Sequence, residues 1–374
     1  MKIKPFALER FFAKYEFSVQ YLLSSSDCDG LLQSELLSWA DLETKNLWDS
    51  LQLGYTESLG LPLLRAEIAK LYKEISSEEV LVVAPEEGIF LALHSFLAED
   101  DHVICTWPGY QSLYEIAFSI GCNLDRWEPD KESGWIFDIH TLEEKIKPAT
   151  KAIILNFPHN PTGYLPSRSD FEKILSLAKK HGLYVFSDEM YRFLEIDSID
   201  RLPSACELYE NAISLFGMSK TFGLAGTRIG WVITRNKELY QKMAAFKDYT
   251  TICSSAPGEV LALIALRARA IIIERHVTRI KKNLSLLDDF FERQKLLLSW
   301  VRPKAGTIGF PQILFEEDAL SFCQRVINEA GVMLLPSTVY DYGTKHFRLG
   351  FGRENMPEVL AMFEKYLTGP GKPV

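Results

Sequence analysis

The sequence predicts an α/β protein whose large lobe holds a mostly parallel sheet covered by helices, beside a smaller α+β lobe. From residue 80 onward, short apolar runs alternate with segments of helical periodicity. That alternation is typical of parallel strands buried on both faces. At 374 residues, the chain is also longer than one hydrophobic core usually serves, so two lobes are expected.

Six short apolar runs predict the buried strands of the large lobe. They are residues 80–83, 102–105, 152–155, 184–186, 212–215 and 230–233. Helical spacing before and between them predicts helices over 61–72, with Pro62 in the first turn, and over 169–180. The order of strands and helices therefore favours a doubly covered sheet.

The two ends of the chain predict the smaller lobe. A long helix is expected over 260–294, then a strand over 347–351 and a last helix over 356–367. We expect residues 1–44 to form an N-terminal arm and part of the small domain, residues 45–259 the large domain, and residues 260–374 the C-terminal small domain.

Residues 1–30 are rich in aromatic side chains, and a helical pattern follows over 30–39. Aromatic side chains in such an arm need burial, so we expect the arm to pack against the small lobe or against a partner subunit. The aromatic residues of the arm are Phe6, Phe11, Phe12, Tyr15 and Phe17.

Charge and composition exclude several classes of protein. The formal net charge is −9 and no block of Lys or Arg occurs, which argues against a nucleic-acid surface. The six cysteines are scattered without metal-ligand spacing, so we expect reduced thiols and no metal site. The first residues lack the apolar core of a signal peptide, and Arg267 and Arg269 interrupt the most apolar helix. We therefore expect no membrane span and a cytoplasmic protein.

Polar side chains follow three of the predicted strands. Asn160, Asp188 and Lys220 each come shortly after one strand ends. Ligands of parallel sheets bind at the carboxyl ends of the strands, so these residues predict a site there. An amine, a carboxylate and an amide, with the guanidinium of Arg228 close behind, suit a phosphorylated pyridine aldehyde.

The motifs around these residues resemble those of the pyridoxal 5'-phosphate (PLP)-dependent aminotransferases of class I/II, the fold-type-I enzymes. They are Asn160-Pro161-Thr162-Gly163, Ser187-Asp188-Glu189-Met190-Tyr191 and Ser219-Lys220, with Arg228 eight positions later. Each motif alone is weak, but their order over nearly the whole chain is specific. The resemblance implies the fold-type-I PLP-dependent transferase fold, with residues 45–259 as the PLP-binding domain.

The resemblance implies three catalytic residues. Lys220 forms the Schiff base with the cofactor, which requires a pocket that lowers its pKa. Asp188 pairs with the pyridine nitrogen, and Tyr191 contacts the ring oxygen. Taken alone, Lys220 is also compatible with a surface loop and Asp188 with a helix N-cap.

Further residues are implied to bind the cofactor. Asn160 reaches the ring oxygen, although Asn-Pro and Thr-Gly are also plain turn formers. Tyr110 stacks on the ring, although an aromatic residue after a strand is more often part of the core. The phosphate is bound by Ser219 and Arg228 and by the backbone amides of Glu86 and Glu87 at a helix start.

The phosphate site departs from the family pattern at two positions. Pro85 has no N–H to donate, and Gly217 stands where many relatives carry a hydroxyl. Ser219 is expected to compensate for Gly217.

Two further matches concern the substrate and a second subunit. Arg348 matches the arginine that binds the substrate α-carboxylate, with Asn160 beside it; a surface arginine on an edge strand is the alternative. Tyr55 matches the tyrosine that crosses to the neighbouring subunit's phosphate, which implies a homodimer.

The sequence thus predicts an aminotransferase that moves an amino group between an amino acid and a 2-oxo acid. Residues 86–89 resemble histidinol-phosphate aminotransferase-like members, whereas residues 24–27 and 53–56 resemble capreomycidine synthase-like members. A PLP-dependent lyase or cyclase is therefore the alternative, since PLP itself does not select the reaction. A non-enzymatic PLP-sensing regulator is disfavoured. Such proteins carry a DNA-binding domain ahead of this lobe, whereas few residues precede the Tyr55 region here and the net charge is negative.

Overall fold

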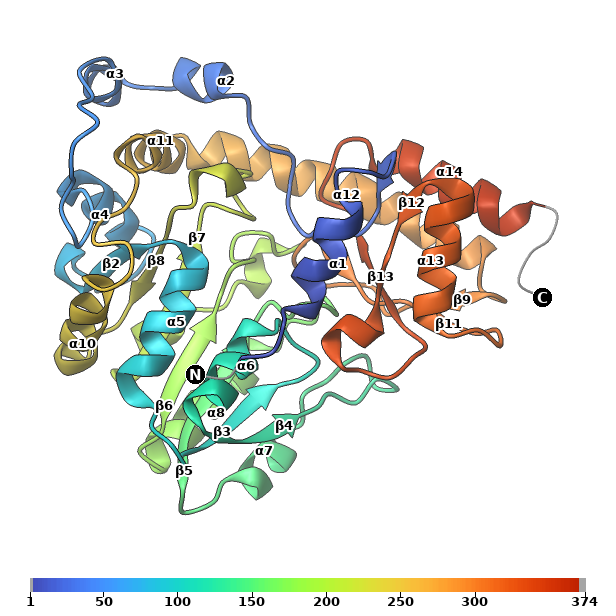
Figure 1. Ribbon diagram of the computed structural model, residues 1–374, viewed down its shortest axis with the longest axis horizontal. Helices are drawn as coiled ribbons and strands as arrows, with labels where there is room; N and C mark the ends of the chain where they lie inside the picture. Colours follow the sequence, from blue (N-terminus) through green and yellow to red (C-terminus); the bar gives the residue numbers. More distant parts are fainter. Residues whose placement is uncertain (1–2, 370–374) are drawn as a thin grey trace.

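The computed structural model describes residues 3–369, which form a large and a small lobe (Figure 1). A seven-stranded sheet lies at the centre of the large lobe, in the order β2-β8-β7-β6-β5-β3-β4. Strand β8 runs antiparallel to the other six strands, which are parallel to one another. In chain order the strands are β2 (Val80–Val83), β3 (His102–Thr106), β4 (Asn123–Trp127), β5 (Thr150–Asn156), β6 (Tyr184–Asp188), β7 (Ala212–Gly217) and β8 (Gly230–Ile233).

Helices cover both faces of this sheet, because alternate side chains of each strand point to opposite faces. Leu81 and Val83 belong to the core on one face, whereas Val80 and Val82 belong to the core on the other. The first face is covered by α5 (Pro85–Phe96), α6 (Ser112–Ile120) and α10 (Lys237–Lys247). The second is covered by α4 (Pro62–Ala69), α7 (Ile139–Lys145), α8 (Arg168–Lys180), α9 (Ala205–Leu208) and α11 (Ala256–Arg267), with α2 (Gln33–Ser38) and α3 (Leu42–Asp49) against α11.

The six predicted strands are all present, and the sequence missed only β4 of this sheet. This strand reads Asn-Leu-Asp-Arg-Trp and lies at the sheet edge, where four of its five side chains are partly or fully exposed. An edge strand needs no continuous apolar run, so its sequence carries little strand signal.

The small lobe combines three helices with short strands. Its helices are α12 (Arg269–Arg293), α13 (Ala319–Ala330) and α14 (Met356–Thr368). Its strands are β9 (Leu298–Ser299), β10 (Ile308–Gly309), β11 (Gln312–Ile313), β12 (Val332–Met333), β13 (Leu335–Pro336) and β14 (Phe347–Gly350). The described chain also contains four 3₁₀ helices, three in the large lobe and one in the small lobe: η1 (Ser77–Glu79), η2 (Ser198–Asp200), η3 (Ala225–Thr227) and η4 (Ser337–Tyr340).

The N-terminal arm packs against the small lobe, one of the two outcomes that its aromatic residues allowed. Helix α1 (Ala7–Tyr15) contacts η4, and β1 (Tyr21–Leu22) pairs with β12. Leu8 and Phe12 are buried there, whereas Phe17 is 93% exposed. The arm thereby lies beside the boundary between the two lobes (Figure 1).

The expectation of a single long helix over 260–294 is wrong, because the structure divides this segment into α11 and α12 at Ala268. At this junction the Arg269 guanidinium donates to the carbonyl of Leu266 at 2.8 Å and to Glu67 at 2.9 Å. The side chain thus adds a hydrogen bond to a carbonyl in the last turn of α11.

Three further observations concern the cysteines, metal ligands and helix lengths of residues 3–369. All six cysteines are free thiols, and five of them are buried. Within the same residues, no group of His, Cys, Asp and Glu side chains is arranged to bind a metal ion. No helix in this part of the chain has the length and apolar character needed to cross a membrane.

Candidate active site

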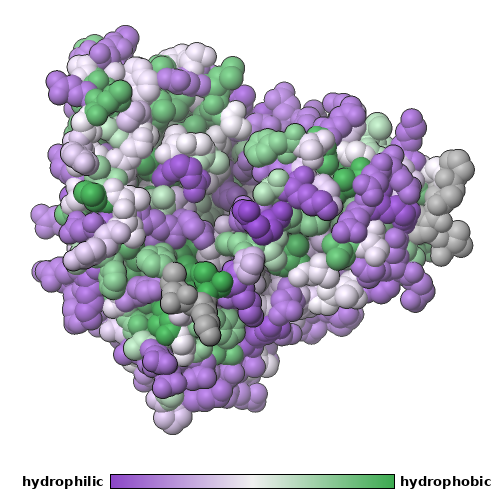
Figure 2. All heavy atoms as spheres, viewed as in Figure 1, coloured by the Kyte–Doolittle hydropathy of each residue, from purple (hydrophilic) through white to green (hydrophobic). Residues whose placement is uncertain are grey.

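A cavity of about 490 Å³ opens where the N-terminal arm and the small lobe meet the carboxyl ends of the large sheet. The space-filling view shows a hollow between the lobes with hydrophilic side chains at its edge (Figure 2). Nine of the predicted site residues line it. They are Lys220, Asp188, Tyr191, Asn160, Tyr110, Ser219, Arg228, Glu86 and Arg348.

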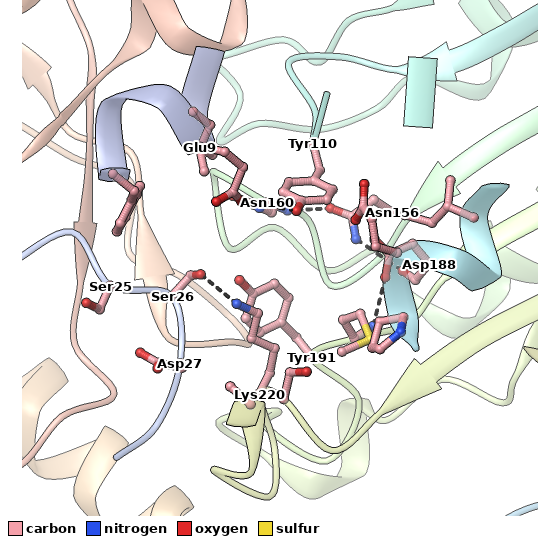
Figure 3. A pocket seen from close by; sticks show the side chains of 18 of the residues that line it. Glu9, Ser25, Ser26, Asp27, Tyr110, Asn156, Asn160, Asp188, Tyr191 and Lys220 are labelled. Atoms are coloured by element: carbon pink, nitrogen blue, oxygen red, sulfur yellow. Dashed lines mark hydrogen bonds between the residues drawn. The ribbon is translucent and has the colours of Figure 1, made fainter. Parts of the chain in front are cut away.

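The amine of Lys220 lies in this cavity after the end of β7 (Figure 3). Its Nζ donates to Ser26 Oγ of the N-terminal arm at 2.9 Å. Burial lowers the pKa of Lys220, and the positive charge of Arg348 adds to this effect, while Asp27 opposes it. The site therefore favours a neutral amine, as a nucleophilic lysine requires.

Asp188 ends β6 and is only 5% exposed. Its Oδ1 accepts a hydrogen bond from the backbone N–H of Met190 at 3.1 Å, and no ion pair of Asp188 occurs among the described residues. Burial raises the pKa of Asp188 to about 7. Within residues 3–369, a carboxylate here therefore forms no ion pair, although the charge of Lys220 partly opposes the effect of burial.

Asn156 and Asn160 form hydrogen bonds at the carboxyl ends of β5 and β6. Asn156 Nδ2 donates to the carbonyl of Asp188 at 3.1 Å, and its Oδ1 accepts from the backbone N–H of Asn160 at 2.8 Å. Asn160 Oδ1 accepts from Tyr340 Oη at 3.2 Å and from Arg348 Nη1 at 3.4 Å. The oxygen of the Asn160 amide is thus engaged, which leaves Nδ2 as the donor for a ligand.

Arg348 brings a positive charge into the interior from β14. Its side chain is 2% exposed and donates to the carbonyl of Ser24 through Nε and Nη2, at 3.1 and 2.8 Å, and to Tyr340 Oη at 2.8 Å. No carboxylate pairs with it in residues 3–369. Since a buried charge without a counter-ion is costly, the guanidinium is placed to bind an anion.

The region predicted to bind phosphate lies at the start of α5. Pro85 is the first residue of this helix, and the backbone N–H groups of the first turn have no partner inside a helix. Glu86 lines the cavity and bonds to Ser112, and burial raises its pKa to about 7. Glu87 does not line the cavity; its carboxylate accepts from Thr251 Oγ1 at 2.7 Å and from the N–H of Ala84 at 3.2 Å.

The two departures from the family pattern, Pro85 and Gly217, share one space. A Cβ at Gly217 would lie 3.3 Å from Pro85 Cγ and 2.9 Å from Gly230 Cα. Gly217 and Gly230 are direct partners of the β7–β8 ladder, and the Pro85 ring lies over both. The backbone of Gly230 and the carbonyl of Ile229, at 3.1 Å, restrict a side chain at position 217 most closely, and the proline ring narrows the same space further.

Arg228 and Tyr55 are exposed members of the predicted set. Arg228 has φ +57°, is exposed at the cavity, and its Nη1 donates to the carbonyl of Ala225 at 2.9 Å. Tyr55 is 88% exposed and does not line the cavity of its own chain. Its predicted role at a partner's site stays a prediction.

Sequence reasoning missed the contribution of the N-terminal arm. Glu9, Phe12, Glu16, Ser26 and Asp27 all line the cavity. The aromatic arm, which had to be buried somewhere, was one signal for them, and the resemblance of residues 24–27 to capreomycidine synthase-like members was a signal for Ser26 and Asp27. Arg353 of the small lobe also lines the cavity and was not singled out.

Comparison with known proteins agrees with this geometry. Residues 18–362 match the family model described as aminotransferase class I and II. A solved PLP-dependent aminotransferase from Streptococcus suis is 30% identical, with a TM-score of 0.92 and 98% of each chain covered.

Curated relatives include enzymes of two kinds. Capreomycidine synthase of Streptomyces vinaceus is 25% identical and covers 92% of this chain and 88% of its own. Aromatic-amino-acid aminotransferase 2 of Thermococcus litoralis is 26% identical, with 84% of each chain covered. The chain therefore belongs to the aminotransferase class I and II family, and it is an enzyme whose cofactor is PLP.

Proposed function

We propose that the protein is an aminotransferase that moves an amino group between an amino acid and a 2-oxo acid, with Lys220 as the residue that holds PLP covalently. One observation carries this proposal: Lys220, Asp188 and the buried guanidinium of Arg348 converge on one cavity. An amine, an acid and an anion-binding group are the three functions that PLP-dependent transamination of an amino acid requires.

The residues of the cavity fit PLP. Asp188 forms no ion pair in the described part of the chain, and the N–H of a protonated pyridine would supply a cationic partner. Tyr191 Oη is buried without a hydrogen-bond partner in residues 3–369, and Tyr191 lines the cavity, so a ring oxygen would satisfy it. Asn160 Nδ2 is a second donor for that oxygen, Tyr110 is an aromatic surface for the ring, and Ser219, Arg228 and the amides of Glu86 and Glu87 would hold the phosphate.

When bound, PLP supplies an electron-withdrawing ring and an aldehyde carbon that carries the amino group. Asp188 would keep the ring nitrogen protonated, because an ionised carboxylate in this dry setting is stabilised by the N–H cation. Lys220 Nζ, whose pKa is lowered, would accept the proton that leaves the substrate Cα. Arg348 would hold the α-carboxylate and so fix the position of that Cα relative to Nζ.

Replacement of Lys220 tests the assignment. Lys220→Ala should reduce transamination by at least about a thousandfold, since it removes both the covalent link and the base. The cofactor's absorption and borohydride fixation, with peptide mapping, show whether the link is to Lys220. Lys237→Ala, an exposed lysine of α10, is the matched control and should keep both properties.

The alternative is a PLP-dependent lyase or cyclase acting on an amino acid, which the similarity to capreomycidine synthase supports. Product analysis separates the two. A 2-oxo acid and aminated cofactor in equal amounts support transamination, whereas a cyclised or eliminated product without aminated cofactor supports the alternative.

The proposal extends to the assembly. We propose a homodimer in which Tyr55 reaches the phosphate of the other subunit, and its 88% exposure in the single chain supports this. A cytoplasmic location and the division of the chain into residues 1–44, 45–259 and 260–374 stay predictions.

A further inference from the structure

One face of the N-terminal helix lines the cavity opposite the sheet. Glu9, Phe12 and Glu16 are spaced by three and four residues, which places them in a row along α1 and its C-cap. All three line the cavity, and Figure 3 shows Glu9 beside Tyr110 and Asn160. This helix face therefore forms the wall that a bound substrate side chain would meet.

Two carboxylates of this wall have no cationic partner. Neither Glu9 nor Glu16 forms an ion pair within residues 3–369, and Glu9 Oε1 only accepts from Tyr110 Oη at 3.3 Å. Burial raises the pKa of Glu16, and the negative charges of Asp27 and Glu9 add to this, while Arg353 opposes it. The two carboxylates lie seven positions apart on one helix face, both line the cavity, and a cation bound between them would be attracted by both.

The other charges of the cavity already have partners. Asp27 accepts from Arg353 through both oxygens, at 3.2 Å each. In the proposed function Asp188 faces the pyridine nitrogen, Arg228 the phosphate and Arg348 the α-carboxylate. Glu86 accepts a hydrogen bond from Ser112, and burial raises its pKa to about 7, so it is only partly charged near neutral pH. Among the described residues, Glu9 and Glu16 are the cavity carboxylates that remain.

The same wall offers contacts for an apolar stem and for further donors. Phe12 is 9% exposed, and its ring centre lies 5.7 Å from Arg348 Cζ, so it lies next to the position proposed for the α-carboxylate. Ser25 also lines the cavity; its side chain is 6% exposed and its Oγ has no partner in the described chain. An unpaired buried hydroxyl indicates a polar ligand group nearby.

We infer that the substrate is an amino acid whose side chain carries a guanidinium or ammonium group on a flexible apolar stem, and that Glu9 and Glu16 bind this cation. The inference rests on the proposed function, because it places the α-carboxylate at Arg348. Phe12 then contacts the methylene groups of the stem. A side-chain carboxylate would instead meet two like charges, and the Arg353 guanidinium that could have received it is held by Asp27.

Binding of unreactive probes tests the inference apart from turnover. 5-Guanidinopentanoate has the carboxylate, stem and cation of arginine but no α-amine, and 5-ureidopentanoate is its neutral counterpart of the same shape. Calorimetry on the holoenzyme should show the guanidinium probe bound about tenfold more tightly, since partly exposed ion pairs are individually weak. The difference should shrink in high salt.

Substitutions show which carboxylates carry the preference. Glu9→Gln and Glu16→Gln should each reduce it, and the double substitution should bring the two probes within about threefold. Glu78→Gln, in η1 and outside the cavity, removes one exposed carboxylate and should leave the preference unchanged.

Equal binding of both probes, binding of neither, or a preference that survives the double substitution would overturn the inference. Spectral titration of the holoenzyme with L-arginine, L-ornithine, L-citrulline and L-glutamate separates this failure from failure of the proposed function. If citrulline or glutamate converts the cofactor best, the proposed function holds and the inference fails. If no cofactor is bound to Lys220, the proposed function itself fails.

Discussion

Replacement of Asp188 by asparagine should stabilise the cofactor-free protein while it lowers activity. The substitution keeps the shape of the side chain, and the Oδ1 of asparagine can still accept from the N–H of Met190. It removes the negative charge that this buried position must otherwise hold without a cation when PLP is absent.

The magnitude follows from the pKa of Asp188, which burial raises from 3.8 to about 7. Below pH 4 the group is protonated in both the folded and the unfolded chain, so it contributes nothing. Between pH 4 and pH 7 the folded protein retains the proton that the unfolded chain releases, and stability falls as pH rises. Three pH units at about 1.4 kcal/mol each give a full penalty of about 4 kcal/mol above pH 7.

Urea denaturation of the cofactor-free wild type and of Asp188→Asn measures this directly. The advantage of the variant should grow by roughly 3 kcal/mol between pH 5 and pH 8. Asp170→Asn is a control of opposite sign, because hydrogen bonds from Lys173 and Ser167 lower the pKa of Asp170. An advantage for Asp188→Asn that is absent or independent of pH would refute the reasoning.

Three further substitutions test the site. Gly217→Ser should lower the free energy of unfolding by about 1–3 kcal/mol, because its Cβ would crowd Gly230 and Pro85. Adding Pro85→Ala should recover part of the loss, and purely additive effects of the two substitutions in urea denaturation would contradict the shared space. Arg348→Gln should raise KM for the amino acid by about 10- to 100-fold in steady-state assays, since a charge-assisted contact is lost, and an unchanged KM would assign the carboxylate to another group. Tyr55→Phe should lower cofactor affinity about tenfold. Mixing Tyr55→Phe subunits with Lys220→Ala subunits should restore one intact site per hybrid dimer, and no recovery of cofactor affinity would argue that Tyr55 does not reach the other subunit's site.

The core of the candidate site was predictable because it depends on sheet topology. Asp188 is the last residue of a strand of one parallel set, Lys220 and Asn160 follow two other strands of that set, and β5 and β6 pair with Asn156 directly opposite Asp188. Strands of a parallel set end at the same edge, so side chains far apart in sequence had to meet there.

The wall formed by the N-terminal arm was not predictable in the same way. Ser26 lies 194 positions from the lysine it contacts, and Tyr340 lies 180 positions from Asn160. No strand register brings these pairs together. Their meeting depends on how α1 and the segment after β1 pack against the small lobe, which is a matter of side-chain packing.

The phosphate region shows a third case. From the local sequence, Pro85 removes an N–H donor for the phosphate, and Gly217 removes a hydroxyl. In the structure the proline ring fills the space beside the two facing glycines, so the positions are coupled by volume. Such coupling between a helix start and a strand end does not appear in either segment alone.

By itself the sequence determined the parallel sheet, the order of its helices, the residues at the strand ends and the family resemblance, because these follow from periodicity and from motifs that are local in the chain. Only the tertiary structure decided that Glu9 and Glu16 line the cavity, that Arg348 is buried without a carboxylate partner among residues 3–369, and that Glu87 does not line the cavity. Those properties depend on distances between segments that are far apart in sequence, and the packing of whole lobes sets these distances.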